Sequence, residues 1–289
     1  MVNEERALLF SVGEDTLLGV LHPGHESATK GVLIVVGGPQ YRIGSHRQFV
    51  LLARFLAARG IPVLRFDYRG MGDATGASRD FEHIADDIAA ALAAFRAAVP
   101  GLREWVLWGL CDAAAAALLC AWRQPAISGL VLLNPWVRTE EGLAKAYLTH
   151  YYARRLFERA FWRDVLAGQI KPLAALRGML DTAWRALAPR AAQPAAQSPA
   201  ASPRLLPLPV RIAEGWQRFS GPILLILSGD DLTAAEFRDV AEHLPQWRGL
   251  LAQRRVRVRE LPAANHTFAR QEWRDQVALW TAEWIERLP

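Results

Sequence analysis

Apolar residues along the chain form short continuous runs that alternate with longer runs in which apolar positions recur at helical spacing. The continuous runs, typical of strands buried in a parallel sheet, cover residues 31–36, 62–66, 105–108 and 129–133. The runs with helical spacing cover residues 49–59, 81–99 and 111–122. This alternation predicts an α/β fold with a doubly wound, mostly parallel sheet and right-handed crossovers.

Polar residues and glycines mark the ends of several elements. The turn residues Val12-Gly13-Glu14-Asp15 separate two short apolar runs, at 7–10 and 17–21, which predicts an opening hairpin. Ser45-His46-Arg47-Gln48 has the form of a capping box that starts the helix over 49–59, and Gly60 is typical of its end.

The alternation stops after Asn134-Pro135. The segment that follows has helical stretches, and then a run rich in proline, alanine, glutamine and serine that is typical of an exposed linker. Strand patterns resume at 223–227 and 256–261. The sequence therefore predicts a core formed by 1–135 and 210–289, a helical cap insertion at 136–188 and a flexible linker at 189–209.

Length and composition agree with one large domain. The chain has 289 residues, 52% of them hydrophobic, which is enough to bury such a core. Its apolar runs are too short to cross a membrane, and Glu4 and Glu5 stand where a signal peptide would be basic and then apolar. We therefore expect a cytoplasmic protein without an integral membrane segment.

The net charge of +5 raises the possibility of an anionic partner. The basic residues are nearly all arginines spread through the chain, and no nucleic-acid-binding motif is present, so we expect no nucleic-acid partner. Arginines are denser between 138 and 163, which would suit an acidic substrate. The histidines lack the spacing of a metal site, and we expect neither a metal nor another cofactor.

Cys111 is the side chain that points most directly to chemistry. It lies in Gly109-Leu110-Cys111-Asp112-Ala113, between a predicted strand and a predicted helix. This is the pattern of a nucleophile elbow, with Cys in place of Ser and Ala in place of the last Gly. The N-terminus of the helix would favour the reactive thiolate. The alternative is a small buried cysteine on an ordinary turn. Cys120 falls at the other end of the helix, too far for a disulfide, and we expect it to be a core residue.

An acid and a histidine follow Cys111 in the order that an elbow nucleophile requires. Asp230 and Asp231 follow the buried strand over 223–227, and His266 follows the strand over 256–261. Nucleophile, acid and histidine in this order are typical of α/β-hydrolases. Asp231 is the better candidate for the acid because it stands just before Thr233-Ala234-Ala235-Glu236, which resembles a capping box. Asp230 is the alternative.

Three motifs resemble a known protein family. They are Gly37 to Phe49, Arg65 to Asp73, and Gly109 to Asp112, and together they look like the exosortase A system-associated hydrolase 1 proteins. The resemblance covers most of the chain. It implies the α/β-hydrolase fold, a hydrolase activity and a setting in bacterial exopolysaccharide production. It also implies that Cys111 is the nucleophile, His266 the base, and Asp231 or Asp230 the acid.

The chemistry expected of these residues is cleavage of an ester or thioester. The oxyanion hole would use the Asp112 N–H and a second donor from the loop after Val36. Pro39 has no N–H, so Gly38 or Gln40 would supply the second donor, unless a side chain such as that of Gln40 or Tyr41 does.

Other residues near the predicted end of the sheet could contact a small-molecule acyl or acylated-saccharide substrate. These substrate-binding candidates are Tyr41, His46, Arg47 and Trp136. Asp67, Arg69 and Asp73 are expected to brace the loop after the strand over 62–66 through charge and hydrogen bonds. Two alternatives to a hydrolase stay open: an acyltransferase that uses the same acyl-enzyme, and a catalytically idle binding or assembly protein.

Overall fold

The computed structural model describes residues 4–38, 40–138 and 206–289. Met1–Val137 and Pro209–Pro289 form one compact unit. The predicted cap at 136–188 and linker at 189–209 lie, apart from their ends, outside the described residues and stay predictions. Among the residues that are described, no helix is long and apolar enough to cross a membrane.

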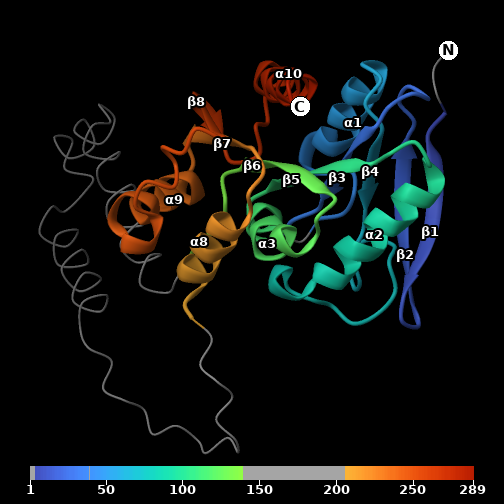
Figure 1. The fold of residues 1–289 in the computed structure, drawn as a ribbon, viewed down its shortest axis with the longest axis horizontal. Helices are drawn as coiled ribbons and strands as arrows, with labels where there is room; N and C mark the ends of the chain where they lie inside the picture. The colour runs from blue at the N-terminus through green and yellow to red at the C-terminus, as the bar shows by residue number, and fades with distance from the viewer. Residues whose placement is uncertain (1–3, 39, 139–205) are drawn as a thin grey trace, which may run out of the picture. The chain divides into compact units, whose positions relative to one another are not determined.

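The core of this unit is an eight-stranded sheet (Figure 1). Its strands run in the order β1-β2-β4-β3-β5-β6-β7-β8. The pairs β1–β2 and β2–β4 are antiparallel, and all other neighbouring pairs are parallel. The mostly parallel sheet predicted from the sequence is therefore confirmed. The strands are β1 (Arg6–Val12), β2 (Asp15–His22), β3 (Lys30–Val35), β4 (Val63–Phe66), β5 (Glu104–Leu110), β6 (Ile127–Leu133), β7 (Ile223–Asp230) and β8 (Val256–Asn265).

Helices cover both faces of the sheet. In Figure 1, α1 and α10 lie on one face, and α2, α3, α8 and α9 lie on the other. The α-helices of the described residues are α1 (Gln48–Ala58), α2 (Ala85–Ala98), α3 (Asp112–Cys120), α8 (Leu208–Arg218), α9 (Leu232–His243) and α10 (Gln271–Glu286). The predicted helix over 81–99 is divided into a 3-10 turn, Phe81–His83, and α2.

The start of α1 differs from the sequence prediction. Ser45 does not cap the helix, because its N–H and its hydroxyl both donate to Gln40 Oε1, at 2.9 and 3.3 Å. Ser45–Arg47 instead forms a 3-10 turn in which His46 and Arg47 have φ of 53° and 60°. The capping-box pattern assigned Ser45 to the start of the helix, but its hydrogen bonds to Gln40 hold it in the loop.

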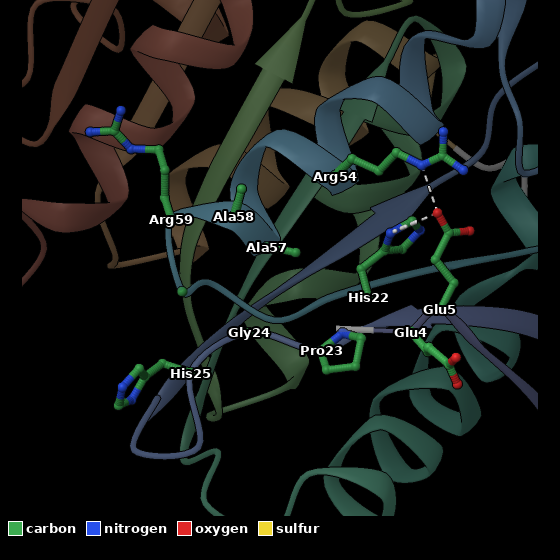
Figure 2. A pocket seen from close by; sticks show the side chains of 11 residues that line it. Glu4, Glu5, His22, Pro23, Gly24, His25, Arg54, Ala57, Ala58 and Arg59 are labelled. Atoms are coloured by element: carbon green, nitrogen blue, oxygen red, sulfur yellow. Dashed lines mark hydrogen bonds and ion pairs between the residues drawn. The ribbon is translucent and has the colours of Figure 1, made fainter. Parts of the chain in front are cut away.

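A chain of buried polar groups connects the opening hairpin with the loop after β3. The side chain of Arg65, on β4, donates from Nε to His22 Nε2 at 2.8 Å and from Nη2 to Glu5 Oε2 at 3.3 Å. Its Nη1 donates to the Arg42 carbonyl oxygen at 3.1 Å. Figure 2 shows His22, Glu5 and Arg54 at the wall of a hollow of about 1000 Å³. Because Arg65 donates to His22 Nε2, that nitrogen carries no proton.

Protonation of His22 should therefore destabilise the fold. Burial, with the charge of Arg65 beside it, lowers the pKa of His22 from 6.5 to about 4. The unfolded chain then binds more protons than the folded one between these two values, so stability should fall as the pH is lowered through that window. The loss should be on the order of 2 kcal/mol.

Chemical denaturation of the wild type and His22→Gln at several pH values tests this. Glutamine keeps an acceptor for Arg65 but does not titrate, so the variant should lose less stability between pH 6.5 and 4. Parallel stability curves for the two proteins would contradict the assignment to His22.

Candidate active site

Cys111 occupies a sharp turn between β5 and α3. Its φ and ψ are 63° and −121°, which places a non-glycine residue in a strained region of backbone conformation. Its N–H donates to the Leu133 carbonyl oxygen at 2.8 Å, and its own carbonyl oxygen accepts from Trp136 N–H at 3.1 Å. A Cβ on Gly109 would lie 2.6 Å from the Ala113 carbonyl carbon. The strand, turn and helix predicted around Cys111 are therefore present, and the turn requires small neighbours.

An aspartate and a histidine meet at the ends of β7 and β8. His266 Nδ1 lies 2.9 Å from Asp231 Oδ2. The side chain of Asp231 is only 6% exposed and that of His266 is 35% exposed. Asp230 is an exposed residue at the end of β7. Of the two acids left open by the sequence, it is Asp231 that bonds to the His266 ring.

Asp231 also starts the helix α9. Its two carboxylate oxygens accept from the N–H groups of Thr233 and Ala234, each at 3.1 Å. The capping-box assignment to Thr233 is therefore wrong, because Asp231 itself is the N-cap. Burial tends to raise the pKa of Asp231, but the bond to His266 and the two N–H groups outweigh it and lower the pKa. An ionised Asp231 favours a proton on His266 Nδ1 and leaves Nε2 as the basic nitrogen.

Asn134, a residue that the sequence interpretation did not assign to the site, ties these strand ends together. It is fully buried directly after β6, with φ of 43°. Its amide nitrogen donates to Ser228 Oγ at 2.8 Å and to the His266 carbonyl oxygen at 3.2 Å. Its amide oxygen accepts from Ser228 N–H at 2.9 Å. The signal in the sequence was a polar residue at the end of an apolar strand, the same position that Asp231 and His266 occupy.

The two backbone donors that the sequence offered for the oxyanion hole, in the loop after β3, are already engaged. Gly38 N–H donates to Asp112 Oδ2 at 2.8 Å, and Gln40 N–H donates to the Gly38 carbonyl oxygen at 2.9 Å. Neither N–H is therefore open in this conformation, unlike the oxyanion-hole arrangement expected from the sequence. The Gln40 side chain is fixed through Oε1 by Ser45.

Comparison with known proteins identifies the family. Residues 32–278 match the model of the alpha/beta hydrolase family. The chain belongs to that family. No match was found among curated protein sequences.

Solved structures share the fold at low sequence identity. An esterase from Pyrococcus furiosus is 15% identical, with a TM-score of 0.65 over 99% of this chain and 93% of that one. A dienelactone hydrolase from Anabaena variabilis is 18% identical, with a TM-score of 0.62 over 100% of this chain and 99% of that one. An alpha-beta serine hydrolase homologue from Coxiella burnetii is 13% identical, with a TM-score of 0.56 over 98% and 97%. These likenesses concern the fold.

The substrate-binding candidates of this α/β hydrolase lie on segments that follow β3 and β6. Tyr41 is 41% exposed, and the Arg42 guanidinium lies 5.4 Å from its ring centroid. His46 and Arg47 belong to the 3-10 turn before α1. Trp136 is half-buried, and its backbone N–H donates to the Cys111 carbonyl oxygen. Both segments start at carboxyl ends of parallel strands, the end of the sheet where Cys111 lies.

Asp67, which directly follows β4, holds the loop that contains Tyr41. Asp67 is fully buried and accepts from the N–H groups of Arg42, at 2.7 Å, and Asp73, at 3.1 Å. Arg69 bonds to Asp87 at 3.0 and 2.9 Å. These contacts support the bracing role expected for Asp67 and Arg69. Among the described residues, no three His, Cys, Asp or Glu side chains are grouped as metal ligands would be.

The hollow of Figure 2 lies at the other end of the sheet. It is lined by His22 and by Gly60, and His22 pairs with Val63, the first residue of β4. Amino ends of parallel strands meet at this edge, whereas the elbow of an α/β hydrolase lies at the carboxyl ends. The hollow is therefore separate from the candidate site.

Exchange of the bonded acid should separate the two aspartates. Asp231→Asn should lower the rate of ester cleavage about 10⁴-fold, because asparagine cannot hold the His266 ring in the required tautomer. Asp230→Asn removes the same charge one residue earlier and should stay within a few-fold of the wild type. Steady-state rates on one ester measure both, and a larger loss in Asp230→Asn would contradict the role of Asp231.

Loss of the Asn134 amide should displace the loop after β8 that contains His266. Asn134→Asp tolerates the positive φ and keeps an acceptor for Ser228 N–H, but it cannot donate to the His266 carbonyl oxygen. We expect kcat to fall up to about 100-fold, with a loss of about 1–3 kcal/mol in unfolding free energy. A variant that is less stable but keeps the wild-type kcat would show that Asn134 serves the fold alone.

Proposed function

We propose that this α/β hydrolase cleaves an ester or thioester bond through a triad of Cys111, His266 and Asp231. The observation that supports this most directly is the 2.9 Å bond between His266 Nδ1 and Asp231 Oδ2. It lies at the same end of the sheet as the strained turn at Cys111, and nucleophile, acid and histidine follow one another in the order typical of the fold.

Cys111, His266 and Asp231 have distinct roles in the proposed reaction. His266 Nε2 accepts the thiol proton, and the Cys111 sulfur attacks the acyl carbon. The tetrahedral intermediate collapses to an acyl-enzyme thioester, while the alcohol or thiol leaves with the proton from His266. Water then attacks the thioester and gives a proton to His266, and His266 passes that proton to the departing Cys111 sulfur, which releases the carboxylic acid and the free thiol. Asp231 stabilises the imidazolium that forms in both halves of the reaction.

The use of cysteine favours activated acyl substrates. A thiolate forms acyl-enzymes readily with esters, lactones and thioesters, but amide cleavage needs strong protonation of the leaving group. The N-terminus of α3 favours the thiolate, because Cys111 directly precedes the helix and the helix dipole places a partial positive charge at that end. The similar structures named as an esterase and a dienelactone hydrolase agree with this substrate class.

The setting is proposed from the sequence resemblance. The motifs after β3, after β4 and at the elbow resemble those of the exosortase A system-associated hydrolase 1 proteins. An acylated saccharide or a lipid-linked intermediate of exopolysaccharide production would fit that setting. Product analysis with acylated saccharides would test this part of the proposal separately from the ester chemistry.

Acylation of the two cysteines by p-nitrophenyl acetate tests the triad. Cys120 is 5% exposed, and burial raises its pKa to about 12, so it should stay unmodified. Intact-mass spectrometry should find a single acetyl adduct in the wild type and in Cys120→Ala, but none in Cys111→Ala. His266→Ala should slow adduct formation because the base is lost. An adduct that survives in Cys111→Ala would rule out Cys111 as the nucleophile.

A further inference from the structure

The carboxylate of Asp112 lies between the first turn of α3 and the loop after β3. Oδ2 accepts from Gly38 N–H at 2.8 Å, and Oδ1 accepts from Ala113 N–H at 2.9 Å. A Cβ on Gly37 would lie only 2.1 Å from Oδ1. Glycine at this position therefore leaves the space that the carboxylate occupies.

These are the groups from which an α/β hydrolase builds its oxyanion hole. The two donors come from the residue after the nucleophile, here Asp112, and from the loop after β3. In that loop Pro39 has no N–H, Gln40 N–H bonds to the Gly38 carbonyl oxygen, and Gly38 N–H bonds to Asp112. A donor aimed at one negative oxygen cannot also stabilise another. The carboxylate thus takes the Gly38 N–H that an oxyanion would otherwise bond to.

Two backbone N–H groups hold this carboxylate. Burial raises the pKa of Asp112, and the bonds from Gly38 and Ala113 and the charge of His266 offset that rise only in part. The pKa of the buried Tyr68 phenol rises to about 12, through burial and through the charge of Asp112 near it. Among the described residues, no lysine or arginine forms an ion pair with Asp112.

We propose that Asp112 is a specificity-determining residue, whose carboxylate fills the oxyanion hole and thereby slows the reaction of Cys111 with simple neutral esters. The inference rests on the proposed function. A substrate carbonyl becomes fully activated only after the carboxylate has left Gly38 N–H and Ala113 N–H. A small ester makes no contact that replaces the free energy of those two charge-assisted bonds. A larger substrate can replace it through contacts elsewhere on the protein.

Two variants of Asp112 test whether its carboxylate blocks the hole. Asp112→Ala empties the space, whereas Asp112→Asn keeps an oxygen that can accept from Gly38 but removes the charge. The second-order rate constant for acylation of Cys111 by p-nitrophenyl acetate should rise at least about 10-fold in Asp112→Ala, since one hole donor is worth about 10²–10³-fold. The rise should be smaller in Asp112→Asn, which also keeps the loop contact if the alanine variant is unstable.

Asp86→Ala is the matched control. Asp86 is an exposed acid in the first turn of α2, so its removal changes the net charge and a helix start in the same way, outside β5, α3 and the loop after β3. Acylation in this variant should stay within about twofold of the wild type. Iodoacetamide supplies a second readout, because alkylation develops no oxyanion. Its plateau rate at high pH, where the thiol is fully ionised, should be the same in all variants.

Each other outcome overturns the inference. Suppose that Cys111 of the wild type is acylated and that Cys111 of Asp112→Ala is acylated no faster. The carboxylate then only holds the loop in place. If acylation and plateau alkylation rise together, the substitution acts on the thiol and not on the hole. If neither the wild type nor any Asp112 variant is acylated at Cys111, the proposed function fails, and the inference fails with it.

Discussion

The sharp turn at Cys111 requires three backbone segments to approach one another more closely than ordinary side chains allow. β5, the first turn of α3 and the loop after β3 meet there, and Gly109 and Gly37 leave room for the contacts. The first turns of α3 consist of alanines that are almost fully buried, so the helix can pack directly against the sheet. This close packing holds a positive φ at a residue that has a side chain, and so fixes where the cysteine sulfur lies.

The other half of the site depends on polar contacts between strand ends. Ser228 and His266 are far from Asn134 in the sequence, yet the Asn134 side chain bonds to both. Each bond satisfies a group that is buried or partly buried, so the loops after β6 and β8 and the end of β7 are held to one another. Asp231 adds a second restraint, because the same carboxylate caps α9 and bonds to His266.

Local patterns were enough to predict the sheet, the strand, turn and helix around Cys111, and the two strand ends that carry Asp231 and His266. Those features depend on apolar runs and on polar residues that directly follow them, and both can be read from consecutive residues. Ser45 shows where local patterns fail: its sequence context fits a capping box, but Gln40 competes for the same groups.

The contact between Asp112 and Gly38 could not have been predicted in this way. It joins residues 74 positions apart, and it depends on how closely two backbones approach. Asn134 was missed for a different reason. Its position after a strand was visible, but the three groups that it bonds belong to other strand ends, whose distances the sequence does not give.

The Arg65 side chain connects the start of the chain and the opening hairpin to a loop of the candidate site. On one side it holds His22 and Glu5, and on the other it holds the carbonyl group of Arg42, in the loop that also contains Gly38 and Gln40. Substitutions in the hairpin therefore act on that loop without touching any reacting atom. In a scan of all single substitutions, Glu5 and His22 would be found among the activity-sensitive positions, and their effects would depend on which residue occupies position 65.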